Sequence, residues 1–225
     1  METIKNLRSL FSGRRVCIVG SAPSGLDNQG SMIDGFDDII RVNRYKFRPW
    51  KDRLGSRTDY HYSFYGSSIK IPREKLKEDG VKGHLCKCPD AKSHFTDWHV
   101  KNRRTRGCDF RWIYTMRKDY WIAPVYIPKR DHYLECFKLL NKHVPTTGFA
   151  CIWELIQCNP KELYITGFDF FASGMHNVNE RWRKGDPEDP IQHIPEVEAE
   201  HVKEWASKYK FITLDKHLRN KFNEK

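Results

Sequence analysis

The sequence lacks any long apolar run. Its 225 residues contain no stretch that approaches the roughly 18 apolar residues of a membrane-spanning helix. The segment Met1–Leu10 has no apolar core behind its charged residues, so it does not resemble a secretory signal. We therefore expect a soluble protein that has no membrane span and stays in the cytoplasm.

Common phosphate and metal motifs are also missing. The turn Gly20–Gly25 has neither the GxGxxG spacing nor the Lys-Ser/Thr pair of a P-loop, and the chain has no DxD pair. The seven cysteines are an odd number without tandem metal-ligand spacing, and Cys86-Lys87-Cys88 is too tight for a CxxC knuckle. His193 and His201 lie eight residues apart with His176 distant, which is not a zinc spacing. We expect thiols throughout and no resident metal or cofactor.

Positive charge is abundant. Forty Lys and Arg against 29 Asp and Glu give a net charge of +11 and a pI of about 9.3. Such a charge attracts anions, which include nucleotides, acidic glycans, lipid headgroups and nucleic acid, and does not choose among them. A hydrophobic fraction of 39% over this length suits one globular domain spanning residues 1–225.

The pattern along the chain predicts an α/β fold with a mostly parallel central sheet flanked by helices. Short apolar or β-branched runs predict strands at 15–20, 38–43, 58–65, 110–115, 121–127, 162–166 and 211–214. Helical spacing predicts helices at 131–142, 149–158, 197–209 and 216–222. The polar, basic stretch 70–105 reads as irregular, so we interpret about 70–130 as a basic insertion or lobe.

Two strand ends carry candidate nucleotide contacts. Gly20 and Ser21 follow the first buried strand, where the backbone can approach a phosphate and a following helix start favours negative charge. Asn43 ends the second strand, at the sheet edge where ligands of open α/β sheets bind. An ordinary strand-ending turn and an Asn that satisfies it are the alternatives.

A helix start and two histidines form the next candidates. Pro145-Thr146-Thr147-Gly148 precedes a helical pattern, so Thr146 or Thr147 can cap that helix while freed N–H groups bind a phosphate or carboxylate. His176 and His193 lie in polar stretches, and histidine suits proton transfer near neutral pH. With ten histidines in the chain, surface residues are the alternative for each.

A basic run combines cations with nearby aromatic residues. Lys101–Arg106 contains Arg103, Arg104 and Arg106 and lies between Trp98 and Trp112. Cations interleaved with aromatic rings suit phosphate contact and stacking on bases or sugars. The run predicts an anionic acceptor site, and a solvated charged loop is the alternative.

Taken together and in order, these motifs resemble those of the sialyltransferases. The stretch from Cys17 to the closing Arg41-Val42-Asn43 is similar to the family's first long motif, and Thr146 to Phe168 to its second. His176-Asn177-Val178-Asn179-Glu180 resembles the third, and His193 with Glu198 the last. Gly167-Phe168-Asp169-Phe170 also fits the strand end of the bacterial members.

The resemblance implies a fold, an activity and residue roles. It implies a GT-A-like variant fold and an inverting, metal-independent glycosyltransferase that moves a sugar from a cytidine-monophosphate (CMP) donor to the hydroxyl of a glycan or other acceptor. His193 would be the general base, and His176 would face the leaving phosphate. Donor contacts would come from Gly20, Ser21, Asn43, Thr146, Thr147, Gly148, Tyr164 and Asp169. Cys17 and Cys158 stand where the animal-type enzymes link two cysteines.

Departures from the family pattern keep other functions open. Ser21 stands where the family usually has Asn, and Phe170 and Phe171 stand where bacterial members tend to have a tyrosine, so the sugar need not be sialic acid. The missing anchor of animal members favours a bacterial, viral or phage enzyme. The alternatives are a glycosyltransferase that modifies a hydroxylated base in nucleic acid with another nucleotide-sugar, and a non-catalytic nucleic-acid-binding module.

Overall fold

A computed structural model describes residues 3–64, 71–89, 121–141, 143–172 and 193–223. In this part of the chain, all strands belong to one eight-stranded sheet of order β1-β6-β5-β4-β3-β2-β7-β8, and every neighbouring pair is parallel. The strands are β1 (Thr3–Ile4), β2 (Arg15–Val19), β3 (Asp38–Val42), β4 (Tyr60–Ser63), β5 (Gly83–Cys86), β6 (Val125–Tyr126), β7 (Glu162–Thr166) and β8 (Ile212–Leu214).

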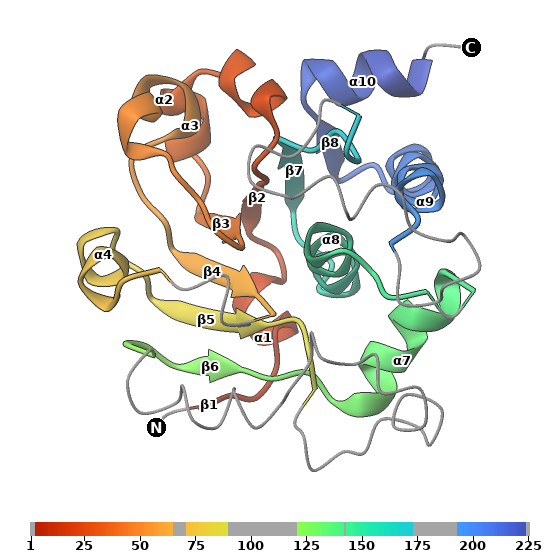
Figure 1. The fold of residues 1–225 in the computed structure, drawn as a ribbon, viewed down its shortest axis with the longest axis horizontal. Helices are drawn as coiled ribbons and strands as arrows, with labels where there is room; N and C mark the ends of the chain where they lie inside the picture. The colour runs from red at the N-terminus through yellow and green to blue at the C-terminus, as the bar shows by residue number, and fades with distance from the viewer. Residues whose placement is uncertain (1–2, 65–70, 90–120, 142, 173–192, 224–225) are drawn as a thin grey trace.

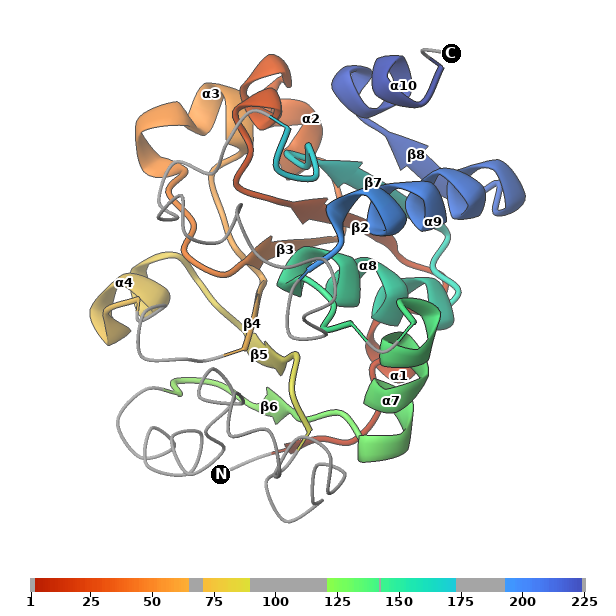
Figure 2. The same ribbon diagram turned by 45° about the vertical axis from the view of Figure 1, so that its right-hand side comes forward.

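Helices cover both faces of this sheet (Figures 1 and 2). The described helices are α1 (Arg8–Phe11), α2 (Gly30–Asp34), α3 (Lys51–Leu54), α4 (Arg73–Glu78), α7 (Arg130–Leu139), α8 (Thr147–Gln157), α9 (Pro195–Lys208) and α10 (Lys216–Asn223), with two short 3-10 helices, η1 (Pro23–Asp27) and η2 (Arg48–Trp50). Helices α2, α3 and α4 lie on one face, and α1, α7, α8 and α9 lie on the other. The predicted α/β architecture is confirmed.

The alternation of strand residues explains the two layers of core. Along β2, Val16 and Ile18 pack in the core beneath α8, while Cys17 and Val19 pack against the α2 face with Ile33. These four of the five β2 residues are buried, as expected for a central parallel strand covered on both faces. The helix α8 is almost entirely buried, which fits its continuous apolar sequence.

The stretch 70–105 differs from its prediction where the structure describes it. Residues 73–78 form α4 and residues 83–86 form β5, which lies inside the sheet between β4 and β6. The predicted strand at 121–127 is observed as the shorter β6. The short sequence Gly83-His84-Leu85-Cys86 has little intrinsic preference for a β-strand. It forms a strand because it pairs with β4 on one side and β6 on the other. The predicted strand at 110–115 lies outside the described residues.

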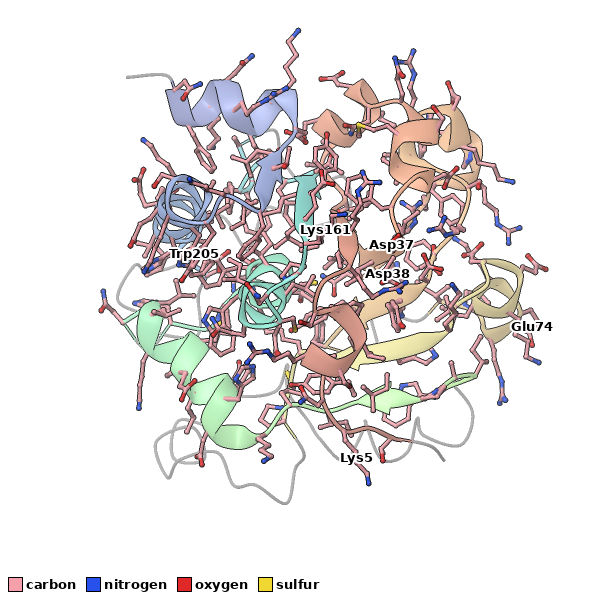
Figure 3. All side chains as sticks on the ribbon, turned by 180° about the vertical axis from the view of Figure 1, so that it is seen from behind. Lys5, Asp37, Asp38, Glu74, Lys161 and Trp205 are labelled. Atoms are coloured by element: carbon pink, nitrogen blue, oxygen red, sulfur yellow. The ribbon has the colours of Figure 1, made fainter. Side chains whose placement is uncertain are left out.

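The order of the strands places a topological switch between β2 and β7. From β2 the sheet grows through β3, β4, β5 and β6 on one side, while the chain later returns to β7 and β8 on the other. Ligands of open α/β sheets bind beyond the carboxyl ends of the strands at such a point. Figure 3 shows the opposite edge, where Asp37, Asp38 and Lys161 gather at the amino ends of these strands.

Candidate active site

The start of α8 is built by a capping threonine. Thr146 has extended backbone angles, and its hydroxyl oxygen accepts a hydrogen bond of 3.1 Å from the N–H of Phe149. This satisfies one of the N–H groups that a helix start leaves without a partner. The predicted cap is therefore confirmed and is assigned to Thr146, while Thr147 and Gly148 begin the helix itself.

Glu198 in the first turn of α9 holds this cap from a second element. Its carboxylate accepts hydrogen bonds of 2.6 Å from both the backbone N–H and the hydroxyl of Thr146. Burial raises the pKa of Glu198 to about 7, against the opposing effects of its bonds to Thr146 and of the nearby Lys87 ammonium. The motif that starts at Thr146 and the motif of His193 with Glu198, both of which resemble sialyltransferase motifs, are therefore in direct contact.

His193 lies just before α9 and is held in one tautomer. It is half-buried, and its Nδ1–H donates a hydrogen bond of 2.7 Å to the carbonyl oxygen of Val144. Since Nδ1 carries the proton, the lone pair of the neutral ring is on Nε2. Burial foremost, and then the Lys87 charge, lower the pKa of His193 to about 4, although the bond to Val144 opposes this shift. His193 is therefore neutral near pH 7, the state that a general base requires.

Lys87 is a member of this cluster that sequence analysis missed. It follows β5, is 4% exposed, and donates a hydrogen bond of 2.6 Å from Nζ to the carbonyl oxygen of Pro145. Three consecutive residues before α8 are therefore each held by a different side chain. The only sequence signal was a lysine directly after the apolar pair Leu85-Cys86, where a strand could end.

Asn43 adopts a left-handed backbone conformation with φ of +54° directly after β3. Its N–H donates to the carbonyl oxygen of Tyr62, and its own carbonyl oxygen accepts a hydrogen bond of 2.8 Å from Nε2 of His61. Ser63 donates to Asn43 Oδ1 at 3.4 Å. Among the described residues Asn43 Nδ2 has no hydrogen-bond acceptor, so it is available as a donor to a ligand.

Hydrogen bonds connect Asn43 to the start of α8. Ser63, which donates to Asn43, accepts a hydrogen bond of 2.9 Å on its carbonyl oxygen from the N–H of Lys87. Lys87 in turn holds Pro145. The carboxyl ends of β3, β4 and β5 and the start of α8 therefore form one bonded unit at this edge of the sheet.

Gly20 is required by a close approach between the ends of β2 and β7. A Cβ atom at Gly20 would lie 2.2 Å from the carbonyl oxygen of Gly167, and the N–H of Ala22 donates to that same oxygen at 2.8 Å. Ser21 is exposed beside this contact. The turn leads into the 3-10 helix η1, so no α-helix starts here to favour a phosphate, in contrast to the expectation.

Phe168 packs against the glycines of two other segments. A Cβ atom at Gly148 would lie 2.4 Å from Cε1 of Phe168, and one at Gly20 would lie 3.1 Å from its Cε2. The ring therefore packs between the loop after β2 and the first turn of α8. Glycine at both positions leaves room for this ring, which a side chain at Gly148 would overlap.

Tyr164 in the middle of β7 and Asp169 beyond its end both take part in hydrogen bonds. The Tyr164 hydroxyl donates a bond of 2.6 Å to Asn28 Oδ1, and its buried ring stacks on Phe36. Asp169 is buried, and its Oδ1 accepts from the N–H of Phe171 at 2.9 Å. Donor contact by either residue remains a prediction.

Phe170 and Phe171 follow with φ of +52° and +63°. Bulky side chains rarely adopt this left-handed conformation, and such strain is concentrated at ligand sites. The bend lies directly after β7, beside the switch point.

The remaining predicted site residues fall outside the described part of the chain. These are the second histidine and the three arginines of the basic run, namely His176, Arg103, Arg104 and Arg106. Their roles stay predictions. In the described ranges, no group of three or more His, Cys, Asp or Glu side chains could hold a metal ion.

The six described cysteines are thiols, as the sequence predicted. Cys17 packs on the α2 face of the sheet, whereas Cys158 at the end of α8 packs on the opposite face. The two positions that resemble the linked pair of animal-type enzymes are therefore separated by the sheet. Burial raises the pKa of both thiols, which makes them unreactive.

Comparison with known proteins identifies the fold. No model of a protein family and no curated protein matches the sequence. A mammalian sialyltransferase in complex with Gal-beta-1-3GalNAc-ortho-nitrophenol matches with a TM-score of 0.55 and 18% identity, over 93% of this chain and 71% of that one. The sialyltransferase CstII from Campylobacter jejuni, in complex with the substrate analogue CMP-3FNeuAc, matches with a TM-score of 0.54 and 16% identity, over 89% and 81%.

No helix of the described ranges combines the length and the apolar character needed to cross a membrane. The sheet order, the helix start at the switch point and these solved structures lead to one assignment. The chain has a sialyltransferase-like fold.

Proposed function

We propose that this protein is an inverting glycosyltransferase that moves a sugar from a CMP-linked donor to an acceptor hydroxyl. The observation that carries the proposal is the hydrogen bond from His193 Nδ1–H to the Val144 carbonyl oxygen, which leaves Nε2 as a base. The lowered pKa of His193 supports the same role, since the ring is neutral at pH 7.

In this mechanism His193 Nε2 accepts the proton of the acceptor hydroxyl as its oxygen attacks the anomeric carbon. The new bond joins that oxygen to the sugar, and the bond between the anomeric carbon and the phosphate oxygen breaks, so CMP leaves with the electron pair. Attack opposite the leaving group inverts the anomeric centre without a covalent intermediate. His193 is left protonated and returns its proton to solvent.

The start of α8 and Asn43 would bind the donor. The N–H groups of Thr147 and Gly148 lie at the positive end of an eleven-residue helix, where an anionic group is stabilised. Asn43 Nδ2 would donate to the nucleotide. His176 would stabilise the charge that develops on the leaving phosphate. These groups need no metal, so we expect activity to survive treatment with EDTA.

Sialic acid is the first sugar to test, because CstII was crystallised with CMP-3FNeuAc. The acceptor is expected to be a glycan or another hydroxyl-bearing molecule of anionic character, given the net charge of +11. A nucleic-acid acceptor depends on Arg103, Arg104 and Arg106, and no contact among the described residues favours it.

A thermal-shift panel of CMP, UMP, GMP and AMP tests the donor class. A ligand that binds the native state stabilises it in proportion to the logarithm of its concentration over Kd, so CMP should raise Tm well above the other three. Equal shifts for all four nucleotides, or a larger shift with UMP, would contradict a CMP-linked donor.

A further inference from the structure

Lys87 is a buried charge that forms no ion pair with the described residues. Its ammonium is in a residue that is 4% exposed, and its described hydrogen bond is the one of 2.6 Å to the Pro145 carbonyl oxygen. No carboxylate among the described residues lies within 4.0 Å of Nζ. Burying an ammonium without an ion pair is costly, so a lysine in this position calls for a specific explanation.

The position of Lys87 beside the segment that holds His193 explains why a lysine is buried here. The carbonyl oxygen of Val144 fixes His193, and the next carbonyl oxygen, that of Pro145, accepts from Lys87. The following residue, Thr146, is held by Glu198. A shift of the Lys87 side chain would move the same three-residue segment to which His193 is bonded.

We propose that Lys87 is a positioning residue for His193, because it fixes the backbone segment that orients the ring and places a positive charge in the same cluster. The inference rests on the proposed role of His193 as base. Protonation of His193 would place a second positive charge near the Lys87 ammonium, and water screens the repulsion little on the side of the buried ammonium.

The other ionisable groups around this cluster are identified by the structure. Glu198 of α9 is buried and bonded to Thr146, and Glu196 is exposed in the same helical turn. Burial raises the pKa of the Cys136 thiol of α7 well above the usual range, against the opposing effect of the Lys87 charge, so this thiol stays neutral. Lys87 is thus the cation that acts on His193 in the described part of the site.

The test measures the pKa of His193 directly, by NMR titration of protein labelled with carbon-13 at histidine, with the signal assigned through His193→Ala. Lys87→Gln retains an N–H donor but removes the charge, and Lys87→Arg retains both. Lys161→Gln is a matched charge control, because Lys161 is exposed at the amino end of β7, on the opposite edge of the sheet (Figure 3).

We expect Lys87→Gln to raise the pKa of His193 by at least about 0.5 unit, as loss of a nearby unit charge requires. Lys87→Arg and Lys161→Gln should leave it unchanged, and the acid limb of the kcat/KM profile should move with the NMR value. An unchanged His193 pKa in folded Lys87→Gln would overturn the proposal.

The wild-type protein gives a second test that does not depend on the folding of a variant. A His193 pKa at or above the ordinary value of about 6.5 would also overturn the proposal. Failure of the proposed function can be told apart from failure of this inference. If no CMP were released from CMP-sugars, the proposed function would be wrong, while the effect of Lys87 on the His193 pKa could still be measured by NMR.

Discussion

Glu198 and Thr146 share two hydrogen bonds of 2.6 Å, through which the first turn of α9 holds the cap of α8. The residues are 52 positions apart, yet the contact joins the helix that follows the proposed base to the helix that would bind the donor. Any change in this contact should therefore affect the geometry of His193 relative to the donor site.

Glu198→Gln should remove a pH dependence of stability. The pKa of Glu198 is about 7 in the folded state, against the ordinary value of 4.5 in the unfolded state. Between these two pH values the folded state binds a proton that the unfolded state has lost. The free energy of unfolding therefore falls as the pH rises from 4.5 through 7, by on the order of 3 kcal/mol in the wild type. Urea titrations at pH 4.5, 6 and 8 measure this.

The variant with Gln at position 198 mimics the protonated side chain, so its stability should vary less over this range. Glu200→Gln is the matched control, because Glu200 is exposed on the same helix. A Glu198→Gln protein with the same pH slope as the wild type would show that Glu198 does not titrate near neutral pH.

Gly20→Ala should be strongly destabilising. Its Cβ atom would lie 2.2 Å from the backbone oxygen of Gly167, which cannot move without breaking the bond from Ala22. We expect a loss of about 2 kcal/mol or more in urea unfolding. Gly35→Ala is the control, because its φ is −75° and its nearest contact would be 3.3 Å, and it should cost less than about 1 kcal/mol. Equal losses would refute the close approach at the switch point.

Asn43→Gly should weaken CMP binding by about tenfold or more while the fold is retained. Glycine accepts the φ of +54° at this position, so the variant removes the amide side chain without backbone strain. One or two lost hydrogen bonds correspond to roughly this change in Kd, which calorimetry measures. Asn159→Gly, at φ of +52° before β7, is the control. Unchanged CMP affinity in Asn43→Gly would remove this residue from the donor site.

The parts of the fold that the sequence predicted are those with a strong local pattern. Apolar, β-branched runs form β2, β3 and β7. Thr146 caps α8 by accepting a hydrogen bond from Phe149, only three residues further along the chain. β5 was not predicted, because it becomes a strand through its neighbours rather than through its own residues.

The same limit applies to the site. Lys87 acts on Pro145, 58 residues away, and no spacing in the sequence connects them. Phe168 was seen as the end of a motif, while its packing between Gly20 and Gly148 depends on the tertiary fold. Sequence patterns therefore identified the cap and predicted the proposed base, but not the residues that hold them in place.

The central claim, that His193 is the general base, is tested most directly by CMP release from CMP-N-acetylneuraminic acid in wild type and His193→Ala. We expect turnover to fall by about 10²–10⁴, because a positioned proton acceptor is lost, while CMP affinity changes little. His217→Ala, on α10, should retain wild-type turnover. Turnover near the wild-type rate in His193→Ala, with CMP still bound, would contradict the account.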